Sequence, residues 1–182
     1  MNDRKSPAVF LHASRTLALV LLLVTVVTAR AADEFSANAL AGIGRVQVAV
    51  EGIADEFARY GLTTEEMRQR VEARLAAYGL PVVDATTART QPDAAQLLVK
   101  LTTNRDQYSM YFYAVSLRLK RKVPLDATGS SYASSEVWSE GQHGILNPSD
   151  LKAVYGYVDT LLDAFVNAHG RDNAGRPLAA QD

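Results

Sequence analysis

The sequence predicts an α+β fold, a mixed and mostly antiparallel sheet of four to five strands with two amphipathic helices on one face. Two segments repeat apolar residues at spacings of three and four, which is the period of a helix. Other segments alternate apolar and polar residues, which is the period of a half-buried strand. Because each helical segment has one apolar stripe, packing both stripes on the same face of the sheet buries them together and leaves the opposite face polar.

The first 31 residues are predicted to be a cleavable signal peptide. A basic start precedes the uncharged, mostly apolar run 16–28, and Ala29 and Ala31 are the small residues that a signal peptidase requires. Cleavage is expected after Ala31. The alternative, a retained anchor, needs about 20 apolar residues to span a membrane, more than this run supplies. The sequence therefore predicts a periplasmic protein with no stable membrane anchor after cleavage.

The chain after the leader has the composition of a single folded domain. The predicted boundaries are a flexible segment at 32–42, one α+β domain at 43–170 and a flexible tail at 171–182. With 48% hydrophobic residues, the 182-residue chain is too apolar for a disordered protein. The absence of cysteine excludes disulfides, thiolate nucleophiles and the lipidated cysteine of a lipoprotein.

Charge and histidine content exclude two further classes of partner. The whole chain carries a net charge of −1, and since the first 31 residues hold four basic residues and one acidic residue, the remainder carries −4. Such a domain lacks the basic surface that nucleic acid requires. Of the three histidines, His12 lies in the leader, whereas His143 and His169 are far apart and have no metal-ligand spacing. We expect no metal and no cofactor.

The first two elements of the domain are predicted from local signals. Residues 44–53 alternate around three valines, which predicts a strand. A helix follows, with Thr63 as N-cap and Glu66 as its capping-box partner. Gly79 provides the left-handed residue that ends a helix, and Pro81 prevents its continuation. The apolar stripe of this helix consists of Met67, Val71, Leu75 and Tyr78.

The middle of the chain is predicted to form a loop and a hairpin. Residues 81–84 are expected to form a short strand, and the polar stretch 85–93 is expected to be a loop. Strands at 96–103 and 109–123 are close enough in sequence to pair as an antiparallel hairpin. One face of the longer strand is apolar, and the other carries polar and basic side chains.

The end of the domain is predicted to be a strand and a closing helix. A turn at 126–131 leads to a strand at 134–141. The helix begins with Asn147 or Ser149 as N-cap and ends at Gly170. Its apolar positions repeat at threes and fours: Leu151, Val154, Tyr155, Val158, Leu161, Leu162, Phe165 and Val166.

This order of elements, with the helix exit Gly79-Leu80-Pro81, resembles the amino-terminal domain of the periplasmic protein TolB. It also resembles domains of envelope lipoproteins that activate cell-wall synthases, over about residues 43–169. The stretch Trp138-Ser139-Glu140-Gly141 before a closing helix is similar to one in small exported bacterial proteins of unknown function. The resemblance implies envelope scaffolding or partner binding without enzyme activity. The missing cysteine departs from the lipoprotein members.

The longer strand of the hairpin carries the leading candidate for a binding surface. Arg118, Lys120 and Lys122 project from one face, and Phe112 is left on the same polar side. Such a row suits anionic headgroups or cell-wall polymers, and an aromatic beside cations suits a contact patch. The alternative interpretation is a solvated face that lysines protect against edge pairing. Trp138, on the following strand, is the fifth candidate for partner binding.

An enzyme is the alternative hypothesis. Glu136, Trp138 and Glu140 alternate, so a strand would project two carboxylates and an indole from one face, with His143 nearby. This arrangement would suit a hydrolase of an envelope polysaccharide or ester. The competing interpretation is an edge strand whose tryptophan covers the sheet.

The sequence therefore favours a non-enzymatic periplasmic binding or scaffolding protein, with an envelope protein or a cell-wall or lipid component as partner. A homo-oligomer is a third hypothesis, because sheet edges and an amphipathic helix can pair between copies.

Overall fold

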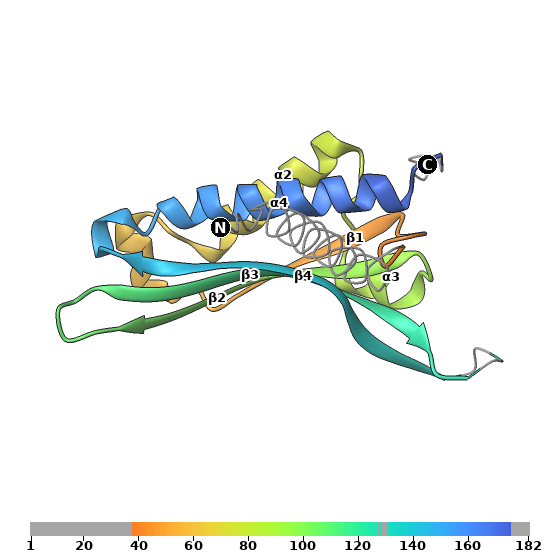
Figure 1. The fold of residues 1–182 in the computed structure, drawn as a ribbon, viewed down its shortest axis with the longest axis horizontal. Coiled ribbons are helices and arrows are strands. Elements are labelled where there is room, and N and C mark those ends of the chain that lie inside the picture. Colours follow the sequence, from red (N-terminus) through yellow and green to blue (C-terminus); the bar gives the residue numbers. More distant parts are fainter. Residues whose placement is uncertain (1–37, 127, 129–130, 176–182) are drawn as a thin grey trace, which may run out of the picture. The chain divides into compact units, whose positions relative to one another are not determined.

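A four-stranded sheet in the order β1-β2-β3-β4 forms one layer of the fold, and the two long helices pack against one of its faces (Figure 1). The first two strands are parallel and the other neighbours are antiparallel. The predicted fold class is confirmed, with four strands. Their bounds are β1 Arg45–Glu51, β2 Ala94–Arg105, β3 Tyr111–Pro124 and β4 Tyr132–Leu146.

The computed structural model describes residues 38–126, 128 and 131–175, all of which lie in one structural unit. The predicted signal peptide, its cleavage site and His12 lie outside the described residues. The predicted domain boundaries stay predictions.

The hydrophobic core lies between the sheet and the two long helices, α2 (Thr64–Tyr78) and α4 (Ala153–Asp172). The predicted stripe of α2 is buried at Met67, Val71 and Leu75, because a spacing of four residues keeps these side chains on one side of the helix. The 3-10 helix η1 (Asp55–Tyr60) adds Phe57, whose ring packs edge-on against Tyr111 at 5.3 Å between centroids. Both long helices therefore cover the same sheet face, as predicted.

The ends of α2 are those that the sequence predicts. The Thr63 hydroxyl accepts a hydrogen bond from the amide of Glu66 at 3.2 Å. Gly79 lies in the left-handed region, with φ 87°, and its amide donates to carbonyls of the last turn. These local signals mark where the helix starts and stops.

Two predictions for residues 81–93 are wrong. The expected loop contains the short helix α3 (Ala85–Thr90), because the Asp84 carboxylate accepts hydrogen bonds from the amides of Thr86 and Thr87 at 2.7 and 2.9 Å. The backbone hydrogen bond from Thr87 is also the main reason that the pKa of Asp84 is lowered. The expected short strand is a single bridge between Val82 and Val46.

The strand and helix at the end of the domain have different bounds from those predicted. β4 extends to Leu146, because it stays paired with β3 as far as Tyr111. A 3-10 turn, η2 (Pro148–Asp150), precedes α4, and Asn147 makes no side-chain cap. Gly170 lies inside α4, and Asn173 satisfies the carboxyl-terminal turn instead, its amide side chain donating to the carbonyl of His169 at 2.9 Å.

The residues just before β1 are tied to the end of α4. Leu40 is fully buried, and its amide donates to the Asp172 carboxylate at 2.9 Å. The amide of Gly42 donates to the side-chain oxygen of Asn173 at 2.8 Å. Where they are described, the segments 32–42 and 171–182 are therefore joined by hydrogen bonds.

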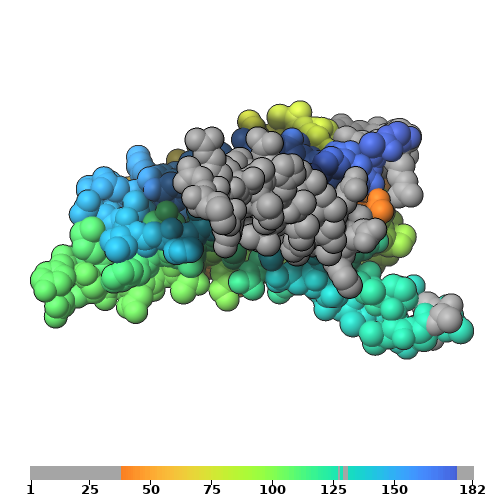
Figure 2. Space-filling view, viewed as in Figure 1, coloured from red at the N-terminus to blue at the C-terminus, as the bar shows by residue number. Residues whose placement is uncertain are grey.

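The β3–β4 hairpin extends beyond the other strands. The pairing of β2 with β3 ends at Arg121, whereas β3 and β4 stay paired to Pro124 and Tyr132. The hairpin end, coloured teal, protrudes in Figures 1 and 2.

Candidate functional site

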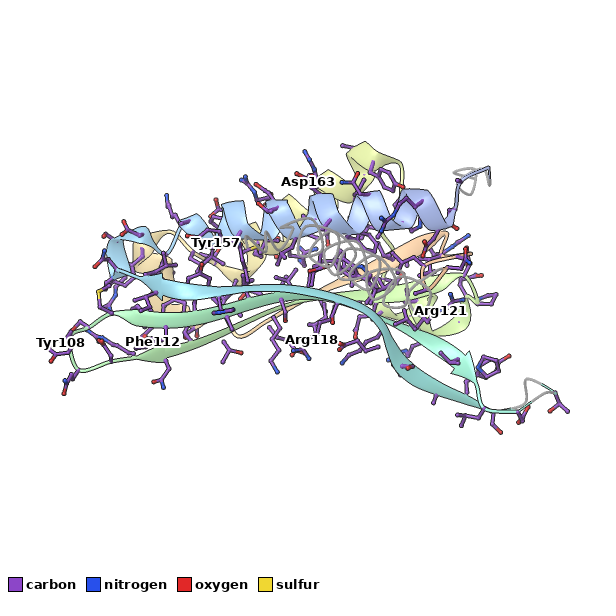
Figure 3. The ribbon with its side chains drawn as sticks, viewed as in Figure 1. Tyr108, Phe112, Arg118, Arg121, Tyr157 and Asp163 are labelled. Atoms are coloured by element: carbon purple, nitrogen blue, oxygen red, sulfur yellow. The ribbon has the colours of Figure 1, made fainter. Side chains whose placement is uncertain are left out.

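The sheet has one face that α2 and α4 do not cover, and we call it the open face. Leu117 and Leu119 of β3 are buried in the core, so the residues that alternate with them point the other way. Figure 3 shows Arg118 pointing away from α4. The predicted row of Arg118, Lys120 and Lys122 therefore lies on the open face.

The charges of the open face are mostly positive. Lys100 of β2 joins the row of β3, since it is paired with Ser116. Two carboxylates share the face: Glu51, which is paired with Lys100, and Glu136, whose carboxylate is 3.6 Å from the guanidinium of Arg118. This ion pair is exposed and contributes little to stability. The face keeps a net positive charge on a chain whose total charge is −1.

One end of the open face is apolar. Phe112 is paired with Ile145 of β4, and both side chains are about half exposed, at 49% and 55%. Tyr108, in the turn before β3, is 77% exposed. The sequence prediction included Phe112 and missed Ile145, because the predicted strand ended before it. If the alternating pattern of the predicted strand had been continued past residue 141, it would have identified Ile145.

Trp138 lies on the covered side of the sheet, so its predicted place beside Glu136 is wrong. Its ring packs against Phe165 of α4 at 5.4 Å between centroids. The register explains this position: Leu119 is paired with Trp138 but Lys120 with Glu136, so a β-bulge lies between them. The extra residue reverses the alternation, and Glu136 and Trp138 point to opposite faces.

The same bulge separates the carboxylates of the hydrolase hypothesis. Glu140 is paired with the buried Leu117 and shares its side of the sheet, whereas Glu136 is paired with Lys120 on the open face. His143 is paired with Ala114, farther along the open face. The two glutamates therefore do not face a common substrate position, which an acid–base pair requires.

His169 is a structural residue of the core. It is fully buried, and its Nε2 lies 2.8 Å from the carbonyl oxygen of Ile43, which can only accept a hydrogen bond. Its Nδ1 lies 3.1 Å from the hydroxyl of Tyr78. The ring thus joins α4, α2 and the segment before β1.

The described ranges contain neither a cluster of metal-ligating side chains nor a helix that could span a membrane. In residues 38–126, 128 and 131–175, no three His, Cys, Asp or Glu side chains are grouped so that they could hold a metal ion. No helix within these ranges has the length and apolar character needed to cross a membrane.

Comparisons with known proteins give distant likenesses among solved structures. No protein-family model matches the sequence, and a search of curated proteins found no match. Among solved structures, the chain is similar to a PelC variant from Paraburkholderia phytofirmans, a dodecamer, at 16% identity and a TM-score of 0.39, over 67% of this chain and 87% of that one. It is also similar to a minor lipoprotein from Acinetobacter baumannii, at 9% identity and a TM-score of 0.30, over 71% of this chain and 93% of that one.

Both TM-scores are low, so neither likeness assigns a fold family or a function to this chain. The resemblance to the TolB amino-terminal domain stays a prediction.

Proposed function

We propose that the chain is an exported, non-enzymatic binding or scaffolding protein of the bacterial envelope, which holds an anionic envelope component on the open face of its sheet. The observation that carries this proposal is the row of Arg118, Lys120 and Lys122, placed together on the open face of a net acidic chain. Complementary charge steers a partner to one face and orients it there.

The spacing of the row suits a polymer. Alternate residues of a strand are about 6.6–6.8 Å apart, so the three cations of β3 are evenly spaced along it. An anionic envelope polymer presents charges repeatedly along its length and can contact several of these basic side chains at once. The combined interaction is then stronger than any single exposed ion pair.

The apolar end of the open face supports the same function. Phe112 and Ile145 are paired across β3 and β4 and leave about half of each side chain exposed. Such a patch adds contact area next to the charged row. By contrast, catalysis has weaker support, because the bulge places Glu136 and Glu140 on opposite faces.

Charge reversal of the row tests the proposal. Protein purified after export is mixed with isolated cell envelopes and sedimented at increasing salt. The triple variant Arg118→Glu, Lys120→Glu, Lys122→Glu should reduce the sedimented fraction at least about fivefold, and binding of the unmodified protein should weaken with salt, as expected for exposed charges.

A matched control carries the same change in charge on other elements. Arg59, Lys152 and Arg171 are exposed and lie in η1, before α4 and within α4. The variant Arg59→Glu, Lys152→Glu, Arg171→Glu should sediment nearly as the unmodified protein does. An equal loss in both variants, or no loss in either, would contradict a role for the open face.

A further inference from the structure

The short helix α3 and the end of the basic row enclose a pocket of about 260 Å³. α3 packs against β1 and β2 on the open face, so it forms a wall at one end of that face (Figure 1). The floor comes from Gln47 and Gln96 on adjacent strands, and Ala85 and Ala88 form the inner side of α3. Its volume is slightly below the range of about 300–1,000 Å³ that is typical of small-molecule sites.

The lining of this pocket is strongly basic. Arg89, Lys120, Arg121 and Lys122 line it, and among the described residues that do so none is an aspartate or glutamate. Arg121 alternates with Lys120 and Lys122 along β3, so its side chain points to the covered face. The side chains of Arg89, Lys120 and Lys122 are therefore the three cations at this concavity, where water screens a positive potential less than on a flat surface.

Two of the four basic residues hold the pocket together. The Lys122 ammonium donates to the carbonyl of Arg89 and so fastens α3 to β3. The Arg121 guanidinium donates to the carbonyl of Ala41 at 3.0 Å. Both contacts hold the elements around the site in place, and Lys122 also adds charge to it.

The other two cations are available to a ligand. The Arg89 guanidinium contacts only the Thr86 hydroxyl, at 3.5 Å, among the residues that the structure describes. The ammonium of Lys120 has neither a hydrogen bond nor an ion pair within that same part of the chain. A guanidinium fork and an ammonium group are the donors that carboxylate and phosphate oxygens favour.

Neutral polar groups complete the lining. The Gln96 side-chain amide donates to Gln47 at 2.8 Å, and Gln47 donates to the carbonyl of Val48 at 2.7 Å. This chain fixes the orientation of both amides, and the Gln96 side-chain oxygen accepts no hydrogen bond from the described residues. Together with the Ser134 hydroxyl, it provides donor and acceptor groups of the kind that sugar hydroxyls require.

We propose that this α3 pocket binds one anionic saccharide unit, whose carboxylate or phosphate contacts Arg89 and Lys120 and whose hydroxyls contact Gln96 and Ser134. This proposal rests on the proposed function, because it names the chemistry of the anionic component. The row of β3 continues out of the pocket, so a bound unit could belong to a longer polymer that follows the row.

Calorimetric titration of the exported protein tests the pocket. The probes are a glucuronate-containing disaccharide, glucose 6-phosphate, the neutral disaccharide of the same linkage, and inorganic phosphate. At least one of the two anionic sugars should bind about tenfold more tightly than the neutral disaccharide and than inorganic phosphate, because only it satisfies both halves of the lining. The anionic sugar that binds more tightly shows whether the pocket prefers a carboxylate or a phosphate. Equal binding of the neutral disaccharide, or of inorganic phosphate, would overturn the proposal.

Two variants locate the binding. Arg89→Gln removes a ligand contact and should lower the affinity for the anionic sugar at least about fivefold. Ala88→Leu keeps every charge and fills the pocket, so it should weaken binding by a similar factor. Arg74→Gln removes the same charge on α2 and should change the affinity less than about twofold. Unchanged affinity in both pocket variants overturns the site.

The two proposals fail in different ways. If no saccharide binds but the protein still sediments with envelopes in a salt-sensitive way, the proposal for the pocket is overturned and the proposal for the open face is supported. Saccharide binding that Arg89→Gln weakens, combined with sedimentation that the triple reversal leaves intact, overturns the role of the open face and supports the pocket.

Discussion

At the scale of single residues, two glycines show opposite requirements. Gly52 follows β1 with φ 84°, and a Cβ there would lie 1.8 Å from the carbonyl oxygen of Leu101. The close approach involves backbone on both sides, so no side-chain movement relieves it. Gly156 lies within α4, and a Cβ there would meet nothing within 4 Å. The first glycine is required by the packing of the chain, and the second is not.

Alanine substitutions distinguish these two positions. Gly52→Ala should lower the free energy of unfolding by about 2–4 kcal/mol, from the strained backbone and the displaced strand. Gly156→Ala should raise it by roughly 0.5–1 kcal/mol, because alanine loses less backbone entropy in a helix. Urea unfolding followed by circular dichroism measures both. Similar effects at the two sites would show that the contact between Gly52 and Leu101 is absent.

At the scale of elements, a hydroxyl from α4 completes the start of α2. The amide of Thr63 donates to the Tyr155 hydroxyl at 3.1 Å, and that hydroxyl donates to the Glu66 carboxylate at 3.0 Å. In the predicted capping box, Glu66 would accept from Thr63 directly. Instead, Tyr155 stands between them, so the cap of one helix depends on its packing against the other.

Removal of this hydroxyl tests the link between the helices. Tyr155→Phe should lower the free energy of unfolding by about 1–2 kcal/mol, since it leaves a half-buried amide and a carboxylate without their partner. The comparison variant is Tyr60→Phe, whose hydroxyl makes no hydrogen bond to the described part of the chain. In thermal or urea unfolding, Tyr60→Phe should change the free energy of unfolding by less than about 0.5 kcal/mol. If the two substitutions have equal effects, the bridge does not contribute.

The elements that the sequence predicted correctly are those with signals in neighbouring residues. α2 is such a case, with its cap, apolar stripe and terminal glycine within one short segment. α3 was missed because its cap, Asp84, opens a polar stretch with no apolar stripe. The bulge at Val137 was missed because it is defined by pairing with β3, and strand alternation alone gave Trp138 and Glu136 the same face.

At the scale of the whole molecule, one part of the candidate site could be predicted from local sequence patterns and the other part could not. The open face follows from the alternation of β3, so Phe112 and the basic row could be placed on it from the sequence. The α3 pocket could not, because its lining extends from Gln47 to Ser134 and five elements must meet to form it. Local patterns predict which way a side chain points, whereas a concave site depends on contacts between distant segments.

The response to alkaline pH is also a property of the assembled molecule, because it comes from tyrosines that lie where separate elements pack together. Burial raises the pKa of Tyr78, of Tyr155 and of Tyr113. For Tyr113, burial and then the hydroxyl of Tyr157 raise the pKa to about 12. Its ring stacks on that of Tyr157 at 5.2 Å between centroids, so α4 and β3 meet at this pair.

The sign of the effect follows from proton binding. Tyr113 releases its proton near pH 10 in the unfolded chain but near pH 12 in the folded one, so the folded state holds more protons in between. Its stabilising contribution is complete below about pH 10 and is lost as the pH rises towards 12. Between about pH 8 and about pH 11, Tyr113 alone should lower the free energy of unfolding by about 1.4 kcal/mol. Tyr113→Phe keeps the ring and removes the titrating hydroxyl, so urea unfolding at the two pH values should show a fall that is smaller by about this amount. Tyr132→Phe, at a position 59% exposed, should leave the fall unchanged. An identical fall in the Tyr113→Phe variant would mean that this hydroxyl is open to water, and that α4 does not close over β3 at this point.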